Sequence, residues 1–389
     1  MLLHRPDDSG RNPFRFGDVA TGEHFTDRDA EIRELVSDLR SGQNVLVISP
    51  RRYGKTSMVT AVIDRIRKQH VLVAYLDLLR TTTKERFANQ LAAELYAGLT
   101  PTVEQAVHRA GELFQNLPLR PKITLNEDGT PSFEFAAVPG ATDIEQTIDR
   151  LLELPQQVAQ RRKRQAVLVL DEFQEIVTLD PDLPARMRAT FQFQPNVAHV
   201  YLGSRQHLLR RVFTDANSPL YNSAKVVPLG PIPRSAFTHF IAERFASTHV
   251  VITKEAIAHL LDLTGGHPHD TQKLGYFTWA AAESLRTPAS AETVDRAFAA
   301  AIATDTAHYT DLWEGLTTNQ RRLLEAIGQA HPSEAVLSED FRRRHRLGAY
   351  ATVERALDSL VERGLVEREG RSRVFVPDVF LHQWLRTSS

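Results

Sequence analysis

The chain has 389 residues, a formal net charge of −1 at pH 7 and no cysteine. Its length predicts two or three domains, and its near-zero net charge excludes an overall field that would attract nucleic acid or a membrane. The lack of cysteine excludes disulfides, thiolate metal sites and cysteine nucleophiles. Residues 1–14 contain no apolar stretch of signal-peptide length, and no segment approaches the roughly 20 apolar residues of a membrane helix. We therefore expect a soluble, cytoplasmic protein that does not contact membranes.

Residues 1–231 alternate between helical and strand-like patterns. Apolar residues recur at helical spacing from Asp27 to Leu39, and residues 44–49 form a short apolar run typical of a buried strand. Further strands are expected at 71–78, 166–170, 197–202 and 225–229, and further helices at 55–68, 83–99, 101–116 and 142–160. This alternation predicts a three-layer α/β/α domain built on a mainly parallel sheet.

One segment interrupts that alternation. Residues 121–136 contain two alternating stretches on either side of Asn126-Glu-Asp-Gly129, which is a strong turn signal. We therefore expect a β-hairpin inserted into the α/β domain.

The pattern changes twice after Pro231. Residues 232–310 carry only helical patterns, broken at Gly265-Gly266 and near Pro288, and we expect them to form a separate helical domain. In residues 311–389 three expected helices precede an alternating segment around Gly370. That order is typical of a winged helix-turn-helix domain, in which the alternating segment forms the wing.

The strongest functional signal lies between the first expected strand and the helix that follows it. A loop in this position can turn its backbone N–H groups around a phosphate, and the helix N-terminus adds partial positive charge. Gly54 allows close approach of the backbone, Lys55 places a cation on the β- and γ-phosphates, and Thr56 offers a hydroxyl to Mg²⁺. The residues expected to bind the nucleotide are Ser49, Pro50, Arg51, Arg52, Tyr53, Gly54, Lys55, Thr56 and Ser57. The usual phosphate-binding loop (P-loop) begins with glycine, and here that position is serine.

A second signal lies at the end of a later strand. The apolar residues 167–170 are followed by Asp171 and Glu172, and ligands of open α/β sheets bind beyond the carboxyl ends of the strands. We expect Asp171 to face Lys55 and to hold Mg²⁺ together with Thr56, and we expect Glu172 to activate the attacking water as general base. The alternative is a plain strand end with surface acids, but the upstream P-loop favours the functional interpretation.

The next strand is expected to end between the P-loop and these carboxylates. Ser204 and Arg205 follow its last apolar residues, and a polar side chain there is placed to sense the γ-phosphate. Together with Lys55 and Glu172 they form the expected catalytic group. An alternative for Ser204 is a helix N-cap.

These segments resemble the archaeal-type ATPases, a family of P-loop ATPases related to the AAA+ and signal-transduction (STAND) ATPases. The resemblance covers nearly the whole chain. The matching segments are residues 25–29, 50–57, 170–176, 202–206, 218–221, 264–268 and 378–385.

The resemblance implies a sheet with the strand order 5-1-4-3-2 and a nucleotide pocket for ATP or ADP. It also implies that Phe16, Phe25 and Arg28 line the adenine pocket. The helices of 232–310 should form a lid in which His267 and Pro268 lie near the nucleotide. By themselves these last residues fit a helix C-cap, a turn and a new helix start equally well.

The chain departs from the family at one further place. Relatives often continue Pro-Leu-Tyr with Gly-Arg, whereas this chain has Asn222 and Ser223. If that arginine acts on the nucleotide in relatives, another residue must act in its place in this chain. Arg205 and Arg210 are candidates.

The winged helix carries candidate DNA-binding residues. Acidic residues interrupt its third helix at Glu354, Asp358 and Glu362, and winged helices also serve as protein-binding modules, so both partners stay open. The residues that would contact double-stranded DNA are Arg342, Arg343, Arg344, Arg346, Tyr350, Thr352, Arg355, Arg371 and Arg373.

Three hypotheses follow. The first is an ATP-hydrolysing, AAA+-like switch that couples nucleotide state to a DNA-contacting winged helix. The second is a nucleotide-gated, STAND-like signalling or defence scaffold with slow or no turnover, a protein-binding winged helix and assembly into a homo-oligomer. The third is a DNA-binding transcription factor with a vestigial P-loop domain, against which the intact carboxylates argue.

Overall fold

The computed structural model describes residues 11–20, 22–99, 113–119, 121–126, 131–134, 141–331, 334–369 and 373–387. The chain divides into two compact units. One runs from Arg28 to Gly230, and the other joins residues 11–27 to residues 231–387. Among the described residues no helix is long and apolar enough to cross a membrane.

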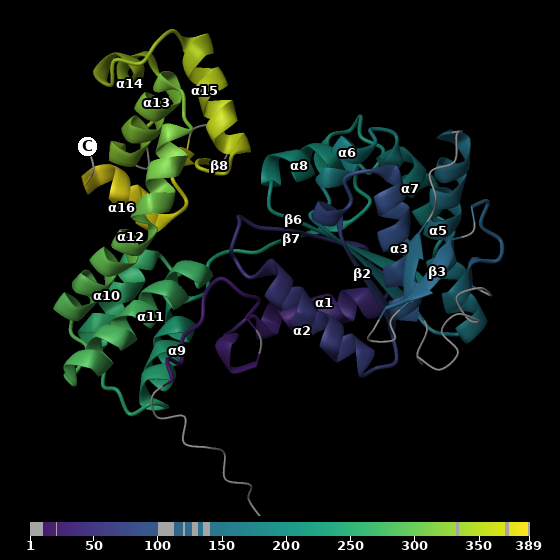
Figure 1. Cartoon of the computed structure of the whole chain (residues 1–389), viewed down its shortest axis with the longest axis horizontal. Coiled ribbons are helices and arrows are strands. Elements are labelled where there is room, and N and C mark those ends of the chain that lie inside the picture. The colour runs from purple at the N-terminus through teal and green to yellow at the C-terminus, as the bar shows by residue number, and fades with distance from the viewer. Residues whose placement is uncertain are drawn as a thin grey trace, which may run out of the picture. The chain divides into compact units, whose positions relative to one another are not determined.

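The first unit is built on a parallel sheet of five strands (Figure 1). In chain order the strands are β1 (Val45–Ile48), β2 (Leu72–Asp77), β5 (Ala166–Asp171), β6 (Val197–Gly203) and β7 (Lys225–Pro228). They lie in the order β2-β5-β6-β1-β7, and every neighbouring pair is parallel. Numbered one to five along the chain and read from β7, this order is 5-1-4-3-2. The order implied by the family resemblance is confirmed.

Helices cover both faces of this sheet, which confirms the three-layer α/β/α class. Helices α1 (Asp29–Arg40) and α2 (Lys55–Arg67) contact each other on one face, where α2 contacts β2. The opposite core includes Leu72, Ala74 and Leu76 of β2, packed with residues of α3 (Lys84–Leu99) and α5 (Ala141–Arg162). Because strand side chains alternate between faces, Tyr75 and Asp77 lie on the α2 face. Further helices described in this unit are η2 (Leu78–Arg80), α6 (Glu175–Leu179), α7 (Leu183–Phe191) and α8 (Gln206–Thr214).

The predicted hairpin is confirmed in its strands. Strands β3 (Lys122–Leu125) and β4 (Pro131–Glu134) pair antiparallel, and Ile123 lies opposite Phe133. Phe133 is buried against the rings of Tyr96 and Phe114, which attaches the hairpin to the core beside α3. The predicted turn after Asn126, residues 135–136 and most of the predicted helix 101–116 lie outside the described residues.

The second unit has one continuous apolar core. Its first helices are α9 (Arg234–Ala246), α10 (Lys254–Thr264), α11 (Pro268–Leu285) and α12 (Ala291–Glu314). The winged-helix elements are α13 (Thr318–Gln329), α14 (Glu339–Arg344), α15 (Tyr350–Glu362), β8 (Glu367–Glu369), β9 (Arg373–Phe375) and α16 (Val379–Thr387). Thr317 caps α13 in a capping box and Ser338 caps α14, as the sequence predicts. Strands β8 and β9 pair antiparallel as the predicted wing.

The described residues 11–27, which include the short helix η1 (Gly22–His24), belong to this second unit. Phe14 is fully buried there, with its ring edge-on to Phe240 and Phe245 of α9. A side chain at Gly275 of α11 would meet the Phe14 ring at 2.7 Å, so glycine makes room for it. The sequence assigns these residues to the P-loop domain. The boundaries 1–231, 232–310 and 311–389 stay predictions.

Candidate nucleotide-binding site

The loop between β1 and α2 has a backbone suited to an anion. Gly54 is the N-cap of α2 and has a φ of 79°, in the left-handed region that favours glycine. Ser49 is buried and is not among the residues with positive φ, and its hydroxyl donates to the carbonyl of Pro50 at 3.0 Å. Serine in place of glycine therefore imposes no backbone strain at this position.

Lys55 opens helix α2, and its side chain turns back over the loop. Its ammonium donates to the carbonyls of Pro50 at 3.2 Å and Ser49 at 3.4 Å. The residue is only 6% exposed. The cation is thus held at the helix N-terminus, where helix dipole and ammonium both favour a bound anion.

Thr56 and Asp171 are brought together, as the sequence predicts. The Thr56 hydroxyl lies 3.4 Å from Asp171 Oδ2, although the two residues are far apart in the chain. Asp171 is 6% exposed, and burial raises the pKa of its carboxyl above the ordinary value.

These oxygens fit a magnesium ion. Within the described ranges, histidine and acidic side chains form no cluster of three that would enclose a metal. Mg²⁺ does not need one, because it keeps several waters and binds through one or two protein oxygens together with substrate phosphates. A hydroxyl and a buried carboxylate beside the P-loop supply that donor set.

Glu172 follows Asp171 with a strained backbone. Its φ of 50° is left-handed, which costs on the order of 1 kcal/mol for a residue other than glycine. Its Oε2 accepts hydrogen bonds from the Ser204 hydroxyl at 2.9 Å, the Ser204 N–H at 3.3 Å and the Gln174 amide at 2.5 Å. The carboxylate is therefore held between the ends of β5 and β6.

Ser204 contacts Glu172 and does not cap a helix. Helix α8 begins at Gln206, its N-cap is Arg205, and no side chain caps it. The N-cap alternative for Ser204 is wrong, because the N-cap position of α8 is Arg205. The Ser204 hydroxyl donates to the carboxylate of Glu172. Arg205 turns toward Glu175, with 3.8 Å between Nη1 and Oε1.

Two residues of this cluster are not among the sequence-predicted ones. The Tyr75 hydroxyl, from β2, donates to Asp171 Oδ2. Gln174 is 3% exposed and bonds to Glu172. Gln174 lies within the matching segment 170–176 and could have been chosen from it. Tyr75 carries no motif, because only the pairing of β2 with β5 brings it to Asp171.

The residues expected around the adenine base, and those expected in the lid near the nucleotide, fall in both units. Arg28 is buried in the first unit with a φ of 71°, and its guanidinium bonds to the Gly230 carbonyl and to Glu31. Phe25, His267 and Pro268 belong to the second unit. There His267 is the N-cap of α11 and accepts a bond from the Asp270 N–H at 3.3 Å, followed by Pro268 as the first helical residue. The capping interpretation is confirmed, and contact of these four residues with the nucleotide stays a prediction.

A family model described as "ATPase domain predominantly from Archaea" matches residues 25–274, which is more than half of the chain. The chain belongs to this ATPase family. A second family model, "Probable winged helix domain", matches residues 307–387. No curated protein matches the chain.

Three solved structures share the fold. The Walker-type ATPase PABY2304 of Pyrococcus abyssi is similar with a TM-score of 0.66 and 17% identity, over 96% of this chain and 99% of that one. The ORC2 protein of Aeropyrum pernix, solved with ADPNP and ADP, gives a TM-score of 0.55 and 14% identity, over 97% and 100%. The ORC1 protein of the same organism, solved in complex with DNA, gives 0.51 and 15%, over 95% and 94%. At these identities the likeness shows the fold alone.

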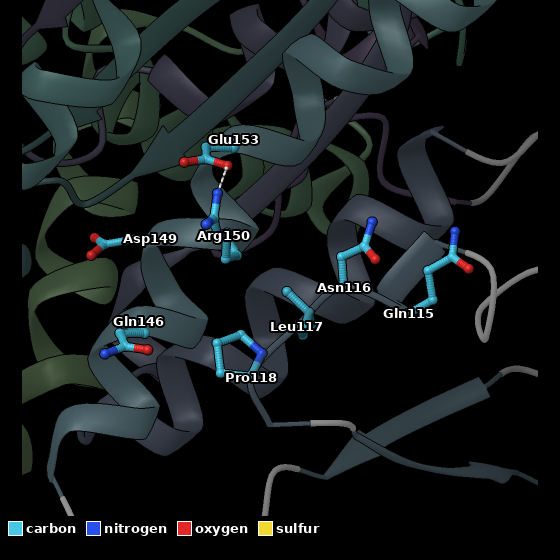
Figure 2. Close-up of a pocket in the computed structure, with 8 residues that line it drawn as sticks. All are labelled: Gln115, Asn116, Leu117, Pro118, Gln146, Asp149, Arg150 and Glu153. Carbon is cyan, nitrogen blue, oxygen red and sulfur yellow. Dashed lines mark hydrogen bonds and ion pairs between the residues drawn. The ribbon is translucent and has the colours of Figure 1, made fainter.

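This archaeal-type ATPase also has a cavity elsewhere in its first unit. A hollow of about 640 Å³ lies between α5 and residues 115–118 (Figure 2). Figure 2 shows Arg150 turned toward Glu153, with which it forms an ion pair of 2.9 Å, and Asp149 pairs with Arg186. None of the sequence-predicted site residues lines it. Its lining carries two carboxylates and one arginine, which is paired with Glu153, so the hollow does not favour an anion.

Most of the predicted DNA-binding arginines contact their own chain. Arg343 pairs with Asp340 at 2.5 Å and Arg344 pairs with Glu334. Arg342 donates to the Leu337 carbonyl, Arg355 to the Ala351 carbonyl, and the Tyr350 hydroxyl to Glu354. Arg373 lies over the ring of Phe375, and Arg371 lies outside the described residues.

Arg346 and Thr352 are placed differently. Together with Arg322 of α13 they line a small hollow beside Gly348 and the N-terminus of α15. Both arginines are exposed. The sequence does not indicate Arg322, because it lies on another helix, more than 20 residues before Arg346 in the printed chain.

Proposed function

We propose that this archaeal-type ATPase binds ATP with Mg²⁺ and hydrolyses it to ADP and phosphate. The observation that carries the proposal is the hydrogen-bonded group formed by Thr56, Asp171, Glu172 and Ser204 at the ends of β5 and β6 and the start of α2. Family membership supports ATPase chemistry in general. The arrangement of these four residues supports it in this chain.

The residues divide the reaction between them. The N–H groups of the P-loop and the Lys55 ammonium bind the phosphates, and Thr56 and Asp171 hold Mg²⁺, which when bound neutralises charge on the phosphate oxygens. Glu172 takes the proton from the attacking water. Ser204 and Gln174 keep its carboxylate in one orientation, so the base is positioned before substrate arrives.

Steady-state phosphate release tests this proposal. We expect MgATP-dependent turnover in the wild-type chain and a loss of at least about 100-fold in Lys55→Ala, because a charged contact to the transferred phosphoryl group is removed. Lys68→Ala is the matched control, since Lys68 is exposed at the other end of α2. Turnover that is equal in wild type and Lys55→Ala would show that hydrolysis comes from a contaminant and would refute the proposal.

We propose further that the winged helix contacts the phosphates of double-stranded DNA. Arg322, Arg346 and Thr352 line one hollow at the N-terminus of α15, where two cations and a helix dipole act on the same point. The fold-level likeness to ORC1, solved in complex with DNA, is compatible with this role. Turnover that rises when duplex DNA is added would support the coupled switch.

A second function has its own support. The ion pairs of Arg343 and Arg344 with carboxylates of the same domain lower the net positive charge that DNA binding requires. They favour the nucleotide-gated scaffold, whose winged helix binds a protein. ATP binding without a DNA effect on turnover, combined with ATP-dependent homo-oligomers in light scattering, would support this function over the first.

A further inference from the structure

The carboxylate of Asp171 is fixed by more bonds than its contact with Thr56. Its Oδ1 accepts the backbone N–H of Glu172 at 2.8 Å. Its Oδ2 accepts the hydroxyls of Thr56, at 3.4 Å, and of Tyr75. Oδ2 therefore has two hydroxyl donors, one from the first turn of α2 and one from β2.

The sheet register explains why Tyr75 reaches this oxygen. Strands β2 and β5 pair in parallel with Tyr75 opposite Val169 and Asp77 opposite Asp171. Tyr75 therefore lies two residues before Asp77, the last residue of β2 and the one that pairs with Asp171. It lies on the face of the sheet that α2 covers. A tyrosine side chain is long enough to span that offset, and its phenol meets the carboxylate beside the first turn of α2.

We propose that Tyr75 is a positioning residue for the magnesium site. Its O–H holds the Asp171 carboxylate in the orientation that places Oδ2 next to the Thr56 hydroxyl, so both protein oxygens face Mg²⁺ together. The proposal rests on the function proposed above. Its physical basis is that the last torsion of an aspartate is soft, and groups that bond to a metal-holding carboxylate fix its direction and affect metal affinity strongly.

A tyrosine suits this task by its geometry. Its hydroxyl reaches Asp171 Oδ2 from the neighbouring strand, and the residue is half-buried on the face of β2 that α2 covers. The variant Tyr75→Phe keeps the ring and removes only the donor.

Calorimetric titration with ADP, with Mg²⁺ and with EDTA, tests the proposal without requiring turnover. We expect Mg²⁺ to strengthen ADP binding in the wild-type chain. In Tyr75→Phe this Mg²⁺-dependent gain should fall by about tenfold, while ADP affinity in EDTA stays unchanged. Tyr309→Phe is the matched control, because it removes a tyrosine–aspartate hydrogen bond of 3.1 Å, to Asp305, in the other unit. It should behave like the wild type.

The outcomes separate this inference from the proposed function. A full Mg²⁺-dependent gain in Tyr75→Phe, or an equal loss of ADP affinity with Mg²⁺ and with EDTA, would overturn the role of Tyr75 and leave the ATPase proposal intact. A wild-type chain that binds ADP equally with Mg²⁺ and with EDTA would overturn the magnesium site and, with it, both proposals. Melting curves of the three proteins establish that each is folded.

Discussion

The nucleotide site and the winged helix both concentrate charged side chains, but they treat charge in opposite ways. Asp171 and Glu172 are held by neutral donors, the hydroxyls of Tyr75 and Ser204 among them. Arg343 and Arg344 are held by carboxylates of opposite sign. Neutral donors orient a carboxylate without cancelling its charge, so the first arrangement stays negative and suits a cation. In the winged helix, the positive charges of Arg343 and Arg344 are already neutralised by carboxylates of the same domain.

The two sites also differ in how exposed their charged side chains are. Asp171 is nearly inaccessible, whereas the side chains of Arg343 and Asp340 are 74% and 76% exposed. An exposed ion pair is worth roughly 0–1 kcal/mol, so a DNA phosphate could replace the aspartate at small cost. The pairing of these arginines is therefore a weak argument for a protein partner. A buried carboxylate beside a P-loop is a strong indicator of a bound ligand.

The largest effect within this comparison is expected at Glu172. Glu172→Gln should lower turnover by about 10²- to 10⁴-fold, because the general base is lost. ATP binding should be retained, since the amide keeps the shape of the side chain. Single-turnover rates and equilibrium ATP binding measure the two quantities. Glu153→Gln, in the cavity of Figure 2, is the control. Unchanged turnover in Glu172→Gln would remove the base assignment.

A smaller effect is expected at Ser204. Ser204→Ala removes one hydrogen bond to the charged Glu172, so kcat should fall by about tenfold. The KM for ATP should change little, because Ser204 orients the base and does not hold the nucleotide in the ground state. A rise in KM with constant kcat would instead assign Ser204 to substrate binding. Steady-state kinetics over a range of ATP concentrations decide between these roles.

The smallest effect is expected in the winged helix. Arg346→Ala should weaken binding to a labelled duplex and reduce the slope of log affinity against log salt by about 0.9, the contribution of one phosphate contact. Arg343→Ala should change both less, because Arg343 is already paired. Fluorescence anisotropy across a salt series measures both values. Equal effects of the two variants would show that intramolecular pairing does not distinguish these arginines.

Much of the fold could be predicted from the sequence. Periodicity predicts the β1–α2 unit, the wing and the caps at Thr317 and Ser338, because these depend on residues close together in the chain. The sheet order came from the family resemblance and is confirmed. The packing of Phe14 could not be predicted, since an aromatic residue in an irregular segment does not indicate which distant core receives it.

The candidate site also contains features that the sequence predicts and contacts that it does not. The sequence by itself determined the loop, its Lys55 and Thr56, and the pair of carboxylates after a buried strand, because these chemistries depend on residues adjacent in the chain. Only the tertiary structure decided that Tyr75 reaches Asp171, that Ser204 holds Glu172 and that Arg322 joins Arg346. These contacts depend on strand register and helix packing, which are set by long-range burial of apolar surface and not by local pattern.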